Sequence, residues 1–191
     1  MAQIGNTTVL PSMTLGVPLA QASGGTGGNY PVYQLILGTA QNTTSGTSID
    51  LTGIPSWAKR ITIMFNGVST NGTSAVLLQL GSSSGGIETS NYASSRFGAV
   101  GTSVFQGSST QGVYVGGGGG AAIISGSYQL CTMATNSWVY SGVVSEGTNI
   151  GSASGGNKYI SSTLDRVRLT TANGTDLFDA GSVNIMYEGY A

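Results

Sequence analysis

The side chains that carry out most acid–base and nucleophilic chemistry are nearly missing from this chain. It has no histidine, and only six basic and seven acidic residues among 191. Asp50 is the first acidic or basic side chain along the sequence. Catalysis at neutral pH relies mainly on His, Asp, Glu, Lys and Cys. The composition therefore argues against a conventional enzyme, and we expect no catalytic residues.

The remaining reactive groups give no pattern typical of a cofactor or metal site. Cys131 is the single cysteine and no histidine exists to activate it, so we interpret it as a small buried apolar residue. Asp176 and Asp179 share one short segment, but Ca²⁺ needs about six to eight oxygen ligands. We interpret that pair as part of a turn. The five glycines at 116–120 lack the Lys-Ser/Thr that a phosphate-binding loop requires. We expect no metal and no cofactor.

Glycoside hydrolysis is the one enzymatic alternative that the composition leaves open. It needs two carboxylates held roughly 5–10 Å apart in a cleft. The chain has seven carboxylates, and no spacing singles out two of them. A carbohydrate-cleaving spike therefore stays a weaker alternative to a binding or structural protein.

The charge pattern also limits the partners. Net charge is −1, and the only close basic groups are Lys59-Arg60 and Arg166 with Arg168. Nucleic-acid binding needs clustered Lys and Arg, so we expect no nucleic-acid partner. No run of 18 apolar residues occurs, and the first residues lack the basic start of a signal peptide. We expect no membrane insertion. So little charge also predicts a surface covered by identical subunits or by a larger particle. The alternative is an uncovered polar surface that Ser, Thr and Asn keep soluble without charge.

The residues that take the place of charges favour an all-β fold. Gly alone contributes 32 residues, while 39% of the chain is hydrophobic. Gly, Asn and Ser favour turns, whereas Thr, Val, Ile and Tyr favour strands. Many short strands joined by such turns predict an antiparallel β-sandwich, jelly-roll-like in type.

The strand signals begin after residue 30. The clearest strand covers residues 60–66, with Ile61, Ile63 and Phe65 on one face. Residues 81–120 and 147–157 are poor in alternating apolar residues, and we expect irregular loops there. The other predicted strands cover 33–37, 48–52, 75–80, 121–125, 128–133, 137–144, 158–161, 166–170 and 182–187.

Two units follow from this pattern. Residues 1–30 predict an extended arm that ends in a flexible Gly-rich link, too small to hold a core of its own. Residues 31–191 predict the β-sandwich head domain.

Four segments resemble tail-fibre and tail-appendage proteins of tailed bacteriophages. Residues 18–27, Pro-Leu-Ala-Gln-Ala-Ser-Gly-Gly-Thr-Gly, are similar to an "LAxASGGTG" link found in such proteins. Residues 53–69, from Gly-Ile-Pro-Ser-Trp to Gly-Val-Ser, resemble the start of a compact domain in them. The closing part of that domain is matched by residues 165–169 and 178–185, which include Phe-Asp-Ala-Gly. The resemblance covers the two ends of the head domain and leaves about 81–160 unmatched.

The resemblance implies a homotrimeric virion component, made in the host cytoplasm and carried on the tail or another external appendage. Residues 1–30 would attach to tail or neck proteins of the particle. The head domain would bind a host-surface glycan or an outer-membrane receptor. A capsid fibre, head-decoration protein or other purely structural virion protein without receptor binding is the alternative, because the same composition suits it.

The candidate receptor-binding residues are Tyr92, Arg96, Phe97 and Tyr114, all within the segment that we expect to be a loop. Aromatic rings in loops stack on flat ligands, and polar neighbours can hydrogen-bond sugar hydroxyls. Packing at a subunit interface is the alternative for each ring. We assign the other prominent aromatic residues to the core or an interface: Trp57, Trp138 and Tyr140.

Overall fold

The computed structural model describes residues 31–117 and 122–191. These residues form strands joined by turns and loops, arranged as two antiparallel sheets, so the predicted all-β fold and β-sandwich class are confirmed. The predicted arm at 1–30 lies outside the described residues. None of the described residues belongs to a helix that is long and apolar enough to cross a membrane.

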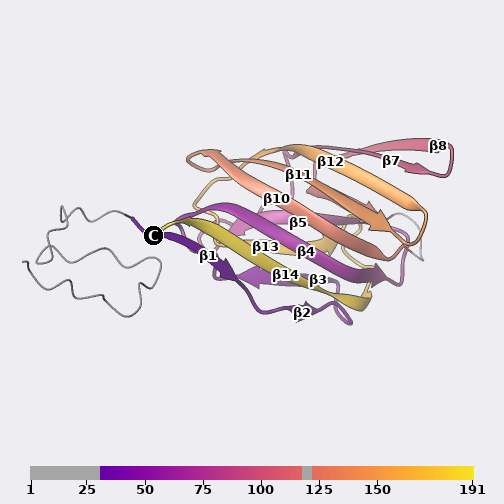
Figure 1. Ribbon diagram of the computed structural model, residues 1–191, viewed down its shortest axis with the longest axis horizontal. Helices are drawn as coiled ribbons and strands as arrows, with labels where there is room; N and C mark the ends of the chain where they lie inside the picture. The colour runs from indigo at the N-terminus through magenta and orange to yellow at the C-terminus, as the bar shows by residue number, and fades with distance from the viewer. Residues whose placement is uncertain (1–30, 118–121) are drawn as a thin grey trace, which may run out of the picture.

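The larger sheet has nine strands in the order β1-β14-β4-β10-β11-β12-β7-β8, with β2 pairing β14. Figure 1 shows β1 beside β14 and the β7–β8 hairpin at the far edge of this sheet. Its strands are β1 (Tyr33–Leu37), β2 (Gln41–Asn42), β4 (Ala58–Thr70), β7 (Ala93–Val100), β8 (Ser103–Ser109), β10 (Ile124–Ala134), β11 (Ser137–Glu146), β12 (Ile150–Tyr159) and β14 (Phe178–Tyr190).

The smaller sheet has five strands in the order β3-β13-β5-β6, and β9 pairs with β5. Its strands are β3 (Ser48–Thr52), β5 (Ala75–Ser82), β6 (Gly86–Ile87), β9 (Val113–Gly117) and β13 (Arg166–Thr171).

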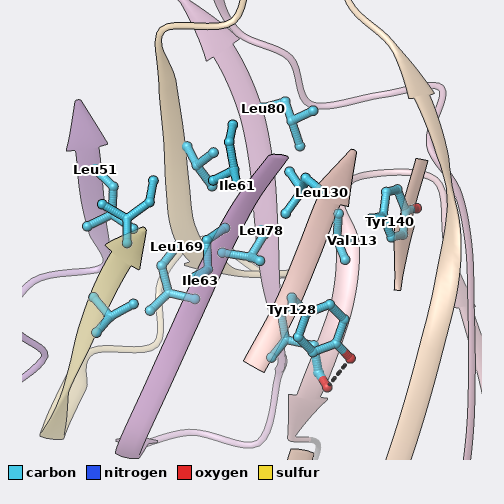
Figure 2. Close-up of a cluster of buried hydrophobic side chains, with 14 of the residues drawn as sticks. Leu51, Ile61, Ile63, Leu78, Leu80, Val113, Tyr128, Leu130, Tyr140 and Leu169 are labelled. Carbon is cyan, nitrogen blue, oxygen red and sulfur yellow. Dashed lines mark hydrogen bonds between the residues drawn. The ribbon is translucent and has the colours of Figure 1, made fainter. Parts of the chain in front are cut away.

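The core lies between the two sheets. Side chains alternate across a strand, so one face of each strand can be buried while the other stays outside. In β4, Ile61, Ile63 and Phe65 are buried as the sequence predicts. They meet Leu78 and Leu80 of β5 and other apolar residues in one continuous cluster (Figure 2). Trp138 and Tyr140 of β11 are part of the same core, which confirms their predicted placement.

Two predicted loops are strands instead. Residues 81–120 contain the end of β5 and all of β6, β7, β8 and β9, and residues 147–157 contain most of β12. The prediction failed because the inward positions of β7 and β12 carry Ser, Arg, Gly and Lys, which hide the usual alternation of apolar and polar residues. Ser94 and Arg96 of β7 and Ser152 and Ser154 of β12 are all buried.

Several smaller predictions have mixed outcomes. Trp57 is partly buried and meets Tyr187 edge to face, with ring centroids 5.9 Å apart, so its core placement is confirmed. Cys131 is only half-buried, because it alternates with the buried Leu130 and points to the outer side of β10. The expected turn near Asp176 is confirmed, since Asn173 Oδ1 accepts the backbone N–H groups of Thr175 and Asp176.

Candidate functional site

The structure brings two of the four predicted site residues together, because the Arg96 guanidinium lies 5.1 Å from the centroid of the Tyr114 ring. Tyr92 directly precedes β7, Arg96 and Phe97 are consecutive residues of β7, and Tyr114 lies in β9. None of these residues sits in the long irregular loop that the sequence predicts. Consecutive strand residues point to opposite faces, so Arg96 and Phe97 face different environments.

Tyr92 is a core residue, with 3% of its surface exposed. Its hydroxyl accepts the backbone N–H of Leu80 at 2.7 Å and donates to the carbonyl of Glu88 at 2.9 Å. Burial raises the pKa of this phenol well above its usual value. The Lys158 ammonium lies 5.1 Å from the ring centroid. Tyr92 therefore joins β5 to the start of β7 and does not face solvent.

Arg96 is also buried, with 6% of its surface exposed. Its guanidinium forms an ion pair with Glu146 and lies between two rings, 4.6 Å from the centroid of Phe105 and 5.1 Å from that of Tyr114. It also donates to the carbonyl of Gly117 at 3.1 Å. The guanidinium is thus fixed on the inner face of the sheet by an ion pair, a hydrogen bond and two cation–π contacts.

Glu146 accepts two more hydrogen bonds, while Arg96 Nε is buried without a hydrogen-bond partner among the described residues. They come from the backbone N–H of Gly117 at 2.8 Å and the hydroxyl of Ser152 at 2.8 Å. The cluster therefore links β7, β11, β12 and β9 and joins the two sheets. A buried carboxylate with a full set of partners is a structural element, because desolvation would otherwise disfavour its charge.

Tyr114 is half-buried and acts mainly through its backbone and ring face. Its N–H donates to the Ser94 hydroxyl at 2.8 Å, and its carbonyl accepts the Ser154 hydroxyl at 2.8 Å. Its ring covers Gly107 of β8, where an added Cβ would lie 2.8 Å from a ring carbon. The Tyr114 ring therefore packs against the inner face of the β7–β8 hairpin.

Phe97 is the one predicted site residue whose ring faces solvent, with 59% of its surface exposed. In the sheet register it lies between Ala153 of β12 and Gln106 of β8. The next outward row is Gly155, Ser95 and Ser108. An exposed aromatic ring thus lies among two serine hydroxyls, one glutamine amide, an alanine and a glycine. We call these six residues the Phe97 shelf.

Two open hollows adjoin the shelf. One of about 320 Å³ is lined partly by Phe97, Ala153 and Gly155, and one of about 470 Å³ partly by Gly107 and Ser108. Ser95, Arg96 and Gln106 line both hollows. An apolar ring beside hydroxyl and amide groups can stack on one face of a sugar and hydrogen-bond its hydroxyls. This arrangement can therefore bind an uncharged, flat, polar ligand.

The sequence did not indicate the partners of Phe97. Gln106 and Ser108 belong to β8 and Ala153 and Gly155 to β12, both of which we expected to be mainly loop. The outward alternation of Ser95 and Phe97 was the available signal, but it becomes visible only once β7 is known to be a strand. Among the described residues, no group of three His, Cys, Asp or Glu side chains is placed to hold a metal ion.

Comparison with known proteins gives no relative for this chain. No protein-family model matches it, and neither the curated proteins nor the solved structures contain a significant match.

Proposed function

We propose that the chain is a structural virion protein of a tailed bacteriophage, a short tail fibre or tail appendage that attaches to the host surface as a homotrimer. Residues 1–30 attach it to tail or neck proteins, and the head domain carries the adhesive surface. The supporting sequence features are the link at residues 18–27 and the paired segments that bracket the head domain. The near absence of charge suits close packing of identical chains, where unpaired charge is costly.

The observation that carries the adhesive role is the position and chemistry of the Phe97 shelf. β1, the first described strand, begins at one end of the sandwich (Figure 1). The turn between β7 and β8 lies at the opposite end (Figure 1). If the arm holds the particle, the shelf lies toward the outward half of the domain. A host-surface glycan is the ligand class that fits an exposed ring among hydroxyl and amide groups.

Two experiments test this proposal. The first labels intact particles with an antibody raised against residues 48–191 and locates the label by electron microscopy. Label on the tail or its fibres supports the tail appendage, and label over the capsid contradicts it. The second measures host adsorption of particles that carry Phe97→Ala.

A control variant distinguishes loss of the Phe97 ring from loss of any exposed aromatic ring. Tyr159→Ala removes another exposed ring, 66% exposed, from the opposite end of β12. We expect Phe97→Ala to reduce adsorption at least tenfold and Tyr159→Ala to leave it unchanged. Equal adsorption by both variants and the parent would contradict the assigned surface.

A purely structural virion role is the second candidate, as a capsid fibre or head-decoration protein. The observation that favours it is a group of exposed apolar side chains at the β1 edge: Tyr33, Leu35 and Leu37 of β1 and Tyr190 of β14. Such a group is typical of a surface that another protein covers. Label over the capsid, together with normal adsorption of Phe97→Ala particles, would favour this role.

A further inference from the structure

A separate hollow lies at the end of the sandwich where β1 begins, away from the Phe97 shelf. It measures about 350 Å³, which is within the range of small-molecule sites. Three connections line it, together with the adjoining ends of β4, β10 and β11: the segment between β3 and β4, the turn between β10 and β11, and the segment between β12 and β13. These connections are far apart in the sequence and meet only in the folded domain.

Lys59 lines this hollow and, among the described residues, is the one basic side chain without an ion pair. The chain has six Lys and Arg residues, and all of them lie among the described residues. The other five pair with carboxylates: Arg60 with Glu188, Arg96 with Glu146, Lys158 with Glu88, Arg166 with Asp165 and Arg168 with Asp50. Lys59 is the one charged residue in the lining, and its ammonium has no carboxylate partner among the described residues.

The other lining groups are uncharged and suited to hydroxyl-rich ligands. Thr135, Asn136 and Thr163 line the hollow and carry hydroxyl or amide groups. Each can therefore donate to and accept from a ligand. The apolar part of the lining includes Trp138, which is 6% exposed, and Met133, which is 69% exposed.

We propose that this hollow binds a carboxylated sugar, with the carboxylate at Lys59 and the hydroxyls at Thr135, Asn136 and Thr163. A single ammonium matches one carboxylate, because Lys acts as a compact point charge. Several neutral donors and acceptors beside an apolar wall match a sugar ring better than they match an aliphatic acid. The site is independent of the Phe97 shelf, so it stands whether or not the shelf is adhesive.

The test uses Trp138 as a fluorescent reporter in the full chain. The chain has two tryptophans, so Trp57→Phe leaves Trp138 as the single one. Trp57 does not line the hollow. Glucuronic acid, glucose and acetate are titrated separately into this Trp57→Phe protein at low salt. We expect saturable binding of glucuronic acid at least tenfold tighter than of glucose or acetate, and weaker binding as ionic strength rises.

Two substitutions in the Trp57→Phe protein test whether the Lys59 ammonium binds the carboxylate of the ligand. Lys59→Gln is expected to weaken glucuronic acid binding about tenfold, the size of one charge-assisted hydrogen bond. Arg60→Gln removes the neighbouring cation, which pairs with Glu188 and does not line the hollow, and should leave binding unchanged. Lys59 is exposed, and an unchanged thermal transition confirms that its variant folds.

Three results would overturn the proposal. They are no saturable binding of glucuronic acid, equal affinity for acetate or glucose, and undiminished binding in Lys59→Gln. Should Lys59→Gln fail to fold, the salt dependence of the Trp57→Phe protein decides: affinity for glucuronic acid that does not fall with ionic strength excludes the role of the ammonium.

Discussion

Arg96 of β7 and Glu146 of β11 form an ion pair whose side chains are 5% and 4% exposed, across the intervening strand β12. The pair joins the β7–β8 hairpin, which carries Phe97, to the middle of the nine-stranded sheet. The rings of Phe105 and Tyr114 contact the guanidinium of Arg96. The backbone N–H of Gly117 and the hydroxyl of Ser152 donate hydrogen bonds to the carboxylate of Glu146. The exposed Phe97 shelf and the buried Arg96–Glu146 cluster therefore lie on opposite faces of the same sheet.

Breaking this pair should destabilise the domain strongly. We expect Glu146→Gln to lower the free energy of unfolding by about 3–5 kcal/mol, because it leaves the Arg96 charge buried without a counterion. The measurement is urea unfolding at neutral pH. The double variant Arg96→Met with Glu146→Leu should recover much of the loss, since no buried charge remains. A Glu146→Gln variant within 1 kcal/mol of the parent would contradict the structural role.

Gly156 of β12 should tolerate no side chain, because the strand lies close against Ala93. An added Cβ would overlap the carbonyl oxygen of Ala93 and approach the Tyr140 hydroxyl at 2.7 Å. We expect Gly156→Ala to cost about 2 kcal/mol or more, since backbone must shift to relieve the overlap. Gly151→Ala in the same strand is the control, because nothing lies within 4 Å of its added Cβ. Equal melting temperatures for the two variants would refute the close contact.

Acid should weaken the contact between the strands β3 and β13. Hydrogen bonds from Arg168, at 2.7 and 2.8 Å, hold the pKa of Asp50 below its ordinary value of 3.8. A carboxylate with a lowered folded-state pKa stabilises the fold fully above its unfolded value, and this contribution is lost as pH falls below about 3.8. Asp50→Asn should therefore show a smaller loss of stability between pH 5 and pH 2, followed by thermal unfolding across that range. An identical acid dependence in both proteins would exclude this contribution.

Substitution of Tyr92 should lower stability and leave adsorption unchanged, whereas substitution of Phe97 should leave stability nearly unchanged. Tyr92→Phe removes the hydroxyl that accepts the buried Leu80 N–H, and we expect a cost of about 1–3 kcal/mol with unchanged adsorption per folded molecule. Phe97→Ala should change the free energy of unfolding by less than about 0.5 kcal/mol, because its ring is exposed. Urea unfolding of the two variants tests this contrast. A large destabilisation by Phe97→Ala would mean that its ring is part of the packing.

Where apolar and polar residues alternate, the sequence was enough to place the strands. β4 is predictable because Ile61, Ile63 and Phe65 alternate with more polar residues, and the same reasoning locates β1, β3 and β13. β7 and β12 were missed because their inward positions hold Ser, Gly and charged residues. The charged ones are buried with partners from elsewhere in the chain: Glu146 of β11 pairs with Arg96, and Glu88 of the segment between β6 and β7 pairs with Lys158.

The sequence by itself determined the all-β class, because its composition favours strands and turns and its central strands alternate clearly. Only the tertiary structure decided that Arg96 lies inside and Phe97 outside, although the two are neighbours in the chain. A strand always sends consecutive side chains to opposite faces, but which face is buried depends on what packs against it. Here β9 brings Tyr114 against the inner face, while no described residue covers the outer one, and Lys59 likewise meets its hollow only when three distant connections converge.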